Sequence, residues 1–221
     1  MTPRPAQPAS PVSPIGSEAL PPVPWWGVAS AALAPVALIG GFLYAGSQVP
    51  GYDPVRSTIS DLAAGDMPGR WLMTTALVLT GLAHIVTAVG LRPADGTGRG
   101  LLGFGGVATL LVAWIPNTDV GHNVVGHMIA AYLAFAALSL WPAVIARNVP
   151  DPPLVLRRRF GQVAAALLGL LVLLTIADII TGGATLGLRE RVLAGAQALC
   201  PLVVVIGLRR AADRGHAPRV Q

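Results

Sequence analysis

The sequence predicts an all-α integral membrane protein that folds as a bundle of six transmembrane helices with its N- and C-termini in the cytoplasm. Three observations predict this class. Hydrophobic residues make up 53% of the 221 residues and charged residues only 11%, about half the share found in soluble domains. The apolar residues gather in six long runs. All fifteen basic residues are Arg, and they flank these runs unequally.

Each apolar run is expected to form one helix, because a chain in lipid must satisfy its backbone hydrogen bonds internally. A span needs about 20 apolar residues to cross about 30 Å of hydrocarbon. The third run is shorter, and we expect its helix to extend into the flanking residues. The runs cover roughly residues 26–46, 71–91, 100–115, 125–146, 162–180 and 191–208.

Proline and alanine dominate the start of the chain, and this composition predicts a disordered tail. Trp25 and Trp26 follow this tail and are expected to anchor the first run at the membrane interface. We therefore divide the chain into a cytoplasmic tail (1–24), a transmembrane domain (25–210) and a second cytoplasmic tail (211–221).

The distribution of Arg predicts the orientation. With the N-terminus inside, eleven Arg residues fall in inner segments and four in outer loops. The positive-inside rule therefore places both termini in the cytoplasm, for a multi-pass protein of the plasma membrane. The four outer residues are Arg56, Arg70, Arg189 and Arg191. Six of the ten acidic residues also lie on or near the outer face, which suggests a polar site there.

Several classes of function are disfavoured by the sequence. The net charge of +5 does not indicate a nucleic-acid partner, because the Arg residues form no continuous stripe. Cys200 is the single cysteine, so neither an intrachain disulfide nor a thiolate metal cluster can form. The sequence contains no nucleophile elbow, phosphate-binding glycine loop or helical His-Glu-x-x-His motif. Membrane lipids are therefore the expected partners.

The loop between the first two runs carries several polar residues. Ser57, Ser60 or Asp61 could cap a short helix that lies at the membrane interface. Alternatively, Asp61 and Arg56 could line an outer pocket. The sequence favours the capping role and leaves the pocket open.

The second run carries Thr80, His84 and Thr87, whose spacing places them on one helix face. This face is expected to point into the bundle, since an ionisable group in lipid is costly. A neutral His84 bonded to a Thr or a backbone carbonyl is the favoured interpretation. A haem or metal ligand and a proton relay are the alternatives.

His122 and His127 lie near the start of the fourth run. Their separation of five residues is poor for shared metal binding on a helix, where a separation of four is usual. We expect His127 to face inward in the first helical turn. Asp119 could then bond the His127 ring or cap this helix, and a functional Asp–His site is the alternative.

The fifth run ends with Thr175 and Asp178 on a shared face. Asp178 needs a partner below the lipid headgroups, and the following segment offers Arg189 and Arg191. An ion pair that fixes the bundle is therefore expected.

Small residues predict close contacts between helices. Gly103, Gly105 and Gly106 leave one side of the third helix almost without side chains, so a neighbouring backbone can approach. Gly40 and Gly41 could act in the same way in the first helix. Pro142 and Pro201 lie within the spans and could kink them.

An ordered set of short motifs resembles the bacterial and archaeal membrane family catalogued as domain of unknown function 998. The resemblance covers roughly residues 27–208 and implies a six-helix membrane protein, with no implied activity. The turn before Asp119 begins Ile-Pro, where the family more often has Phe-Pro. The motifs are Ser57–Leu62, Thr80–Leu82, Pro116–Asp119, His127 and Gly187–Arg191. The resemblance suggests one recurring constellation of Ser60, Asp61, Asp119, His127, Arg189, Glu190 and Arg191.

Four functions follow from these observations. The outer cluster could bind a lipid headgroup or a small solute, or it could lock helix ends in a scaffolding protein. An intramembrane hydrolase or transferase would use Asp119, His127 and Asp61 as acid, base or metal ligands. A redox protein would hold haem through His84. The first two are favoured, so enzyme activity is left open as the less favoured alternative, and no metal or cofactor is expected. The candidate ligand-binding residues are Ser60, Asp61, Asp119, His127, Asp178, Arg189, Glu190 and Arg191.

Overall fold

A computed structural model describes residues 20–121 and 124–216 of the chain. In this part of the chain every regular element is helical, and six helices are long and apolar enough to cross a membrane. The predicted helical class and the number of spans are therefore confirmed. The six helices are α1 (Trp25–Ser47), α3 (Arg70–Gly90), α4 (Gly96–Trp114), α5 (Val125–Leu140), α6 (Arg158–Thr181) and α7 (Leu186–His216).

Several helix bounds differ from those of the apolar runs, and two of the differences concern the short third run and the predicted C-terminal tail. α4 begins at Gly96, so the short third run extends on its N-terminal side, as expected, and ends at Trp114. α7 continues to His216, into the segment that the sequence assigned to a tail. Residues 1–19, which make up most of the predicted N-terminal tail, lie outside the described residues.

Three shorter helices complete the described elements. They are α2 (Ile59–Leu62) and the 3-10 helices η1 (Trp141–Val144) and η2 (Leu154–Leu156). η1 continues α5 directly, and Pro142 stands within it, so the expected disturbance at this proline is a change to a tighter helix. Pro201 lies inside α7, which continues through it.

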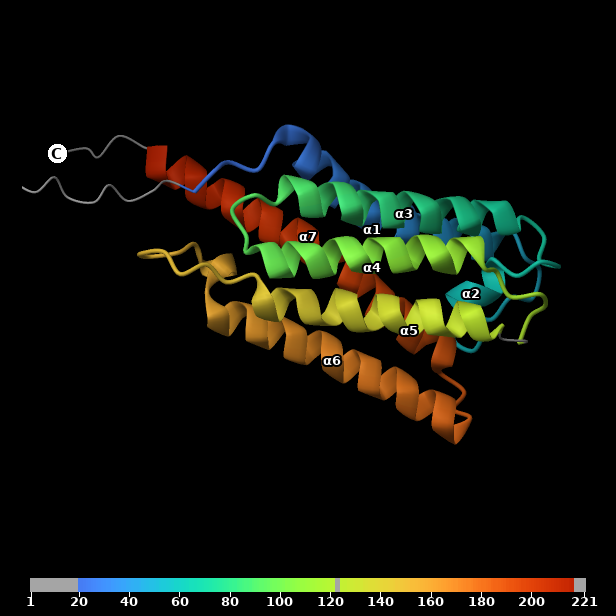
Figure 1. Cartoon of the computed structure of the whole chain (residues 1–221). Helices are drawn as coiled ribbons and strands as arrows, with labels where there is room; N and C mark the ends of the chain where they lie inside the picture. Colours follow the sequence, from blue (N-terminus) through green and yellow to red (C-terminus); the bar gives the residue numbers. More distant parts are fainter. Residues whose placement is uncertain (1–19, 122–123, 217–221) are drawn as a thin grey trace, which may run out of the picture.

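The helices form a layer that a diagonal helix crosses. α1, α3, α4 and α5 pack each against the next, and α7 crosses behind them to contact α1 (Figure 1). α6 packs on α5, α7 and η1, and it is the least buried of the six spans. Both ends of the described chain lie at one end of the bundle (Figure 1). We call the opposite end, which holds α2, the α2 end.

Each end of the bundle has its own apolar core. Near the α2 end, buried residues such as Phe42, Leu62 and Met73 pack together. At the opposite end, Trp141 and Leu156 belong to a second buried cluster. A polar site between the two clusters is therefore enclosed by apolar packing.

Close approach of α3 and α4 confirms the role predicted for Gly106, whereas Gly105 makes room for a side chain of α5. A Cβ atom at Gly106 would lie 2.6 Å from the carbonyl oxygen of Gly81, and one at Gly105 would lie 2.6 Å from Leu138 Cδ2. At Gly103 the nearest atom would be 3.6 Å away, which is ordinary contact. The third glycine is therefore not required for the approach.

The glycine pair in α1 also divides into two roles. A Cβ atom at Gly41 would overlap with the Ala76 side chain of α3, whereas one at Gly40 would meet nothing within 4 Å. Only Gly41 therefore serves close helix packing.

Asp95 caps α4 and provides a pH-dependent contribution to stability. Its Oδ1 accepts the Thr97 backbone N–H at 2.8 Å, and this bond lowers the pKa of Asp95 below its usual range. Asp95→Ala should therefore lower the free energy of unfolding by about 1 kcal/mol. This contribution is fully present above the unfolded-state pKa and is lost as pH falls through the folded-state pKa.

Thermal unfolding of the wild type and Asp95→Ala between about pH 7 and about pH 3 checks this prediction. The difference between their midpoints should shrink with acidity. Asp95→Asn keeps a capping oxygen that does not titrate, so it should lose little stability at any pH in this range. A constant difference between Asp95→Ala and the wild type would contradict the prediction.

Candidate functional site

The short helix α2 forms where the sequence predicted an interfacial helix, but its cap is Thr58 rather than Ser57 or Ser60. The Asp61 backbone N–H donates to Thr58 Oγ1 at 3.1 Å, and the Thr58 backbone N–H donates to Asp61 Oδ2 at 2.7 Å. These two bonds make a capping box. Asp61 Oδ1 also accepts the Gly121 backbone N–H at 3.3 Å, so this buried carboxyl group holds two segments together.

Arg56 does not line a pocket with Asp61. Its side chain is 73% exposed and pairs with Asp53 at 3.6 Å. The alternative of an outer pocket between Arg56 and Asp61 is therefore wrong.

Glu190 attaches α2 to the start of α7. Its Oε2 accepts the Ile59 backbone N–H at 2.6 Å, across 131 residues of sequence. Glu190 is buried, so this hydrogen bond offsets part of the cost of its removal from water.

Arg191 is the main link between α7 and the loop before α2. Its Nη1 donates to the backbone carbonyl oxygens of Pro54, Ser57 and Gly187 at 2.9, 2.7 and 2.8 Å. Its Nη2 donates to the Tyr52 hydroxyl. Arg191 is buried, and its guanidinium donates to backbone carbonyl groups rather than to a carboxylate.

Tyr52 completes this link. Its hydroxyl donates to the Thr58 carbonyl oxygen at 2.9 Å, and its ring lies 5.4 Å from the Arg191 guanidinium carbon. Burial raises the pKa of Tyr52, and the positive charge of Arg191 opposes that rise. The phenol therefore stays protonated and available as a donor at neutral pH.

The expected ion pair between α6 and α7 is confirmed, with Arg189 as the partner. Arg189 Nε lies 3.4 Å from Asp178 Oδ2, and Thr185 Oγ1 donates to the same oxygen at 2.8 Å. Arg189 also donates to the Leu174 carbonyl oxygen at 2.8 Å. Thr175, on the same buried face, bonds back to its own helix.

His127 faces inward in the first turn of α5, as predicted, and is 2% exposed. Its Nδ1 lies 2.7 Å from the Ile115 carbonyl oxygen, and its Nε2 lies 2.9 Å from Ser60 Oγ. The predicted bond from Asp119 is wrong, because Asp119 is exposed and both ring nitrogens have other partners. His122 lies outside the described residues.

Asn117 takes the structural role that the sequence had given to Asp119. Its Oδ1 accepts the backbone N–H of Val124, the residue just before α5, at 3.1 Å. Its carbonyl oxygen accepts the Gly65 backbone N–H at 3.0 Å. The turn after α4 is therefore fixed by an amide side chain that points inward, and α5 has no side-chain cap.

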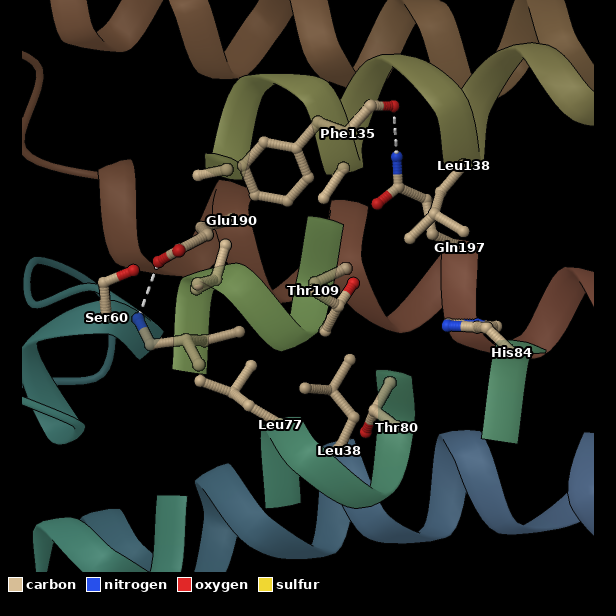
Figure 2. Close-up of a pocket in the computed structure, with 15 residues that line it drawn as sticks. Leu38, Ser60, Leu77, Thr80, His84, Thr109, Phe135, Leu138, Glu190 and Gln197 are labelled. Carbon is tan, nitrogen blue, oxygen red and sulfur yellow. Dashed lines mark hydrogen bonds between the residues drawn. The ribbon is translucent and has the colours of Figure 1, made fainter. Parts of the chain in front are cut away.

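A cavity extends inside the bundle from Ser60 and Glu190 at one end to His84 at the other (Figure 2). It offers about 60 Å³ to the centres of water-sized molecules. Most of its lining is apolar. The polar lining residues are Ser60, Thr80, His84, Thr109, Glu190 and Gln197.

His84 is the unusual group in this cavity. It is 1% exposed, and neither of its ring nitrogens has a hydrogen-bond partner. The expected bond to a neighbouring Thr is absent, because Thr80 bonds to the Ala76 carbonyl oxygen and Thr87 to Ser30. The predicted inward orientation of all three residues is confirmed by their burial.

Gln197 is a lining residue that our reading of the sequence missed. Its Nε2 donates to the Phe135 carbonyl oxygen and to Ser139 Oγ, both at 2.9 Å. A single amide side chain within the sixth apolar run would have indicated an inward-facing residue, by the same argument that placed His84 inside the bundle. Thr109 and Tyr52 were missed because hydroxyl groups are common at such positions.

The described residues contain no group of three or more His, Cys, Asp or Glu side chains that could hold a metal ion. Asp61 and His127 each use their polar atoms on neighbouring segments. The polar groups of these two residues therefore serve hydrogen bonds within the protein.

The fold and this cavity define an all-helical, multi-span membrane protein with buried polar residues in its core. The chain belongs to the family described as "Protein of unknown function (DUF998)", which it matches over residues 32–209. The resemblance found in the sequence motifs is thereby confirmed. No curated protein and no solved structure matches the chain.

Proposed function

We propose that this protein binds a small, largely apolar molecule that carries a hydrogen-bonding oxygen, in the cavity between the α2 end and His84. The observation that carries the proposal is the pair of unpartnered ring nitrogens on buried His84. A buried polar atom without a partner costs about 1–3 kcal/mol. A ligand that offers a donor or acceptor to His84 removes this cost, so the cavity favours such a ligand.

The lining supports an amphiphilic ligand rather than a free ion. Side chains such as Leu77, Val112 and Phe135 form the walls. Polar groups lie at both ends, and Thr80 and Thr109 lie between them (Figure 2). Leu138 lines the cavity and also belongs to the apolar core of the opposite end. That core closes the cavity towards the termini, which favours entry from the α2 end or from the lipid.

The charged residues around α2 support a structural role in holding the helix ends. Arg191, Arg189, Asp61 and Asp178 each bond to other parts of the protein. This use of their polar groups favours the helix-locking role for them over recognition of a lipid headgroup. Ser60 and Glu190 would then be the only residues that belong both to the ligand site and to the contacts that hold the helix ends.

The orientation that we propose places the α2 end outside the cell, with the protein in the plasma membrane. The excess of Arg in the segments predicted to be inner supports this placement. Two of the four Arg residues near the α2 end, Arg56 and Arg189, form ion pairs with Asp53 and Asp178. The free positive charge of that end is therefore smaller than the sequence count suggests.

Substitution of His84 by Leu tests the binding proposal. The variant should be more stable than the wild type without ligand, because it removes two unpartnered polar atoms from an apolar site. Short-chain alcohols and methyl esters should raise the thermal unfolding midpoint of the purified wild type and leave that of His84→Leu unchanged. Native mass spectrometry of both proteins would show whether a small molecule co-purifies with the wild type alone.

Thr87→Val is the matched control for this experiment. Thr87 lies on the same face of α3, bonds to Ser30 at 2.9 Å and does not line the cavity. It should lower stability and leave the ligand response intact. Equal responses of the wild type and His84→Leu to every alcohol and ester would overturn the proposal.

A further inference from the structure

Ser60 and His127 form a pair that the capping of α2 does not explain. Thr58 caps this helix, so the Ser60 hydroxyl is not needed for that purpose. Instead, Ser60 Oγ lies 2.9 Å from His127 Nε2, across 67 residues of sequence. A hydroxyl within hydrogen-bonding distance of an imidazole, whose other nitrogen is held by a third group, is the geometry of an activated nucleophile.

The third group fixes the tautomer of the ring. The Ile115 carbonyl oxygen can only accept a hydrogen bond, so His127 Nδ1, 2.7 Å away, must carry a proton. In the neutral ring Nε2 is then the unprotonated nitrogen, and the Ser60 hydroxyl donates to it. This is the arrangement in which a histidine can take the proton of a serine as a general base.

Ser60 also faces the space in which a substrate would lie. Its side chain lines the cavity, and Figure 2 shows it beside Glu190 at the end nearest α2. Glu190 Oε2 is bound by the Ile59 backbone N–H at 2.6 Å, which fixes the carboxyl group on the other side of Ser60. The Ser60 hydroxyl therefore contacts His127 and also lines the cavity.

We propose that Ser60 is a catalytic nucleophile and His127 its general base, for the cleavage of an ester with an apolar acyl group. The inference rests on the proposed function, because the acyl chain would occupy the same cavity. Ser60 Oγ attacks the carbonyl carbon while His127 Nε2 takes the hydroxyl proton. The bond between that carbon and the alcohol oxygen then breaks, and the alcohol leaves with the proton from Nε2.

Water completes the cycle by the same route. His127 Nε2 removes a proton from water, whose oxygen attacks the acyl-Ser60 ester. The carboxylic acid leaves, and Ser60 Oγ recovers a proton from Nε2. The Ile115 carbonyl is a positioning group throughout, since it holds the ring and its tautomer without touching the substrate. Neither Asp119 nor Asp61 takes part.

Covalent labelling of the purified full-length protein tests this proposal. Alkyl fluorophosphonates react with an activated serine by loss of fluoride, and the adduct is located by peptide mass spectrometry. Both a methyl and a long-chain probe should be used, so that the cavity size does not decide the outcome. We expect an adduct on Ser60 of the folded protein, and loss of this adduct after heat denaturation. His127→Gln should slow its formation by about 100-fold or more.

Ser57→Ala is the matched control, because Ser57 lies three residues earlier in the same segment and does not contact His127. This variant should keep the adduct on Ser60, whereas Ser60→Ala should abolish it. Absence of a Ser60 adduct with both probes, or a rate that His127→Gln leaves unchanged while the variant stays folded, would overturn the proposal. If His127→Gln does not fold, labelling of Ser60 no faster than of other serines in the wild type would overturn it.

The two proposals fail in different ways. Stabilisation by methyl esters without a Ser60 adduct would refute the nucleophile and keep the binding cavity. If methyl esters do not raise the thermal unfolding midpoint of the wild type, ligand binding in the cavity is refuted. The substrate class proposed for Ser60 is then refuted with it.

Discussion

Replacement of Arg191 by Met should lower the free energy of unfolding by about 3 kcal/mol or more, because a hydrogen bond to a charged group contributes about 1.5–3 kcal/mol. The side chain donates to three backbone carbonyl oxygens, at distances of 2.7 to 2.9 Å, and to the Tyr52 hydroxyl. Met fills a similar volume but donates nothing. The carbonyl groups would lose a charged donor at a buried position.

Thermal unfolding in mild detergent, followed by tryptophan fluorescence, would measure this loss. Arg56→Met is the matched control, because Arg56 lies in the same loop with a side chain that is 73% exposed. It should change stability by less than about 0.5 kcal/mol. Arg191→Lys keeps the charge but not the planar fork of donors, so we expect an intermediate loss. A midpoint for Arg191→Met equal to that of Arg56→Met would refute the structural role of this contact.

Replacement of Gly106 by Ala should destabilise the protein by about 1–3 kcal/mol, the usual cost of overpacking a core. The added Cβ atom would lie 2.6 Å from the Gly81 carbonyl oxygen and 2.9 Å from the Ile85 side chain. The first of these is a backbone atom of the facing helix, so relief requires α3 and α4 to separate. Close backbone contact is also what drives helix association where no hydrophobic force acts between helices.

The same substitution one turn earlier should have the opposite sign. At Gly103 the new Cβ atom would stand 3.6 Å from Ala88, an ordinary contact. Alanine is the better helix former by about 1 kcal/mol, so Gly103→Ala should leave stability unchanged or raise it. Unfolding midpoints of the two variants would separate steric exclusion from helix propensity. Equal midpoints would contradict the close approach of α3 and α4.

Most of the architecture could be predicted from the sequence because the membrane imposes a rule that acts along the chain. Apolar runs of sufficient length must become helices, since lipid cannot satisfy backbone groups. The same solvent rule placed His84, His127 and Asp178 inside, because ionisable groups avoid lipid. The short helix at 59–62 was also foreseen, since Ser, Thr and Asp residues mark helix starts.

The partners of the polar residues could not be predicted in the same way. Asp119 and His127 are close in sequence, yet Asp119 is exposed and His127 meets Ser60. Arg191 binds carbonyl groups more than 130 residues away, and Glu190 binds a backbone N–H. Every residue carries a backbone carbonyl group, so the sequence does not indicate which of these groups will accept a hydrogen bond from a side chain.

The sequence by itself determined the class of this protein, its six spans and which polar residues face inward. These properties depend on how each segment interacts with lipid, and they can be read one run at a time. The tertiary structure alone decided that Ser60, His127 and Glu190 meet at one end of a cavity with His84 at the other. That meeting depends on the rotation of α3, α5 and α7 about their axes and on where α2 lies beside them. The apolar periodicity of a span that faces lipid specifies neither.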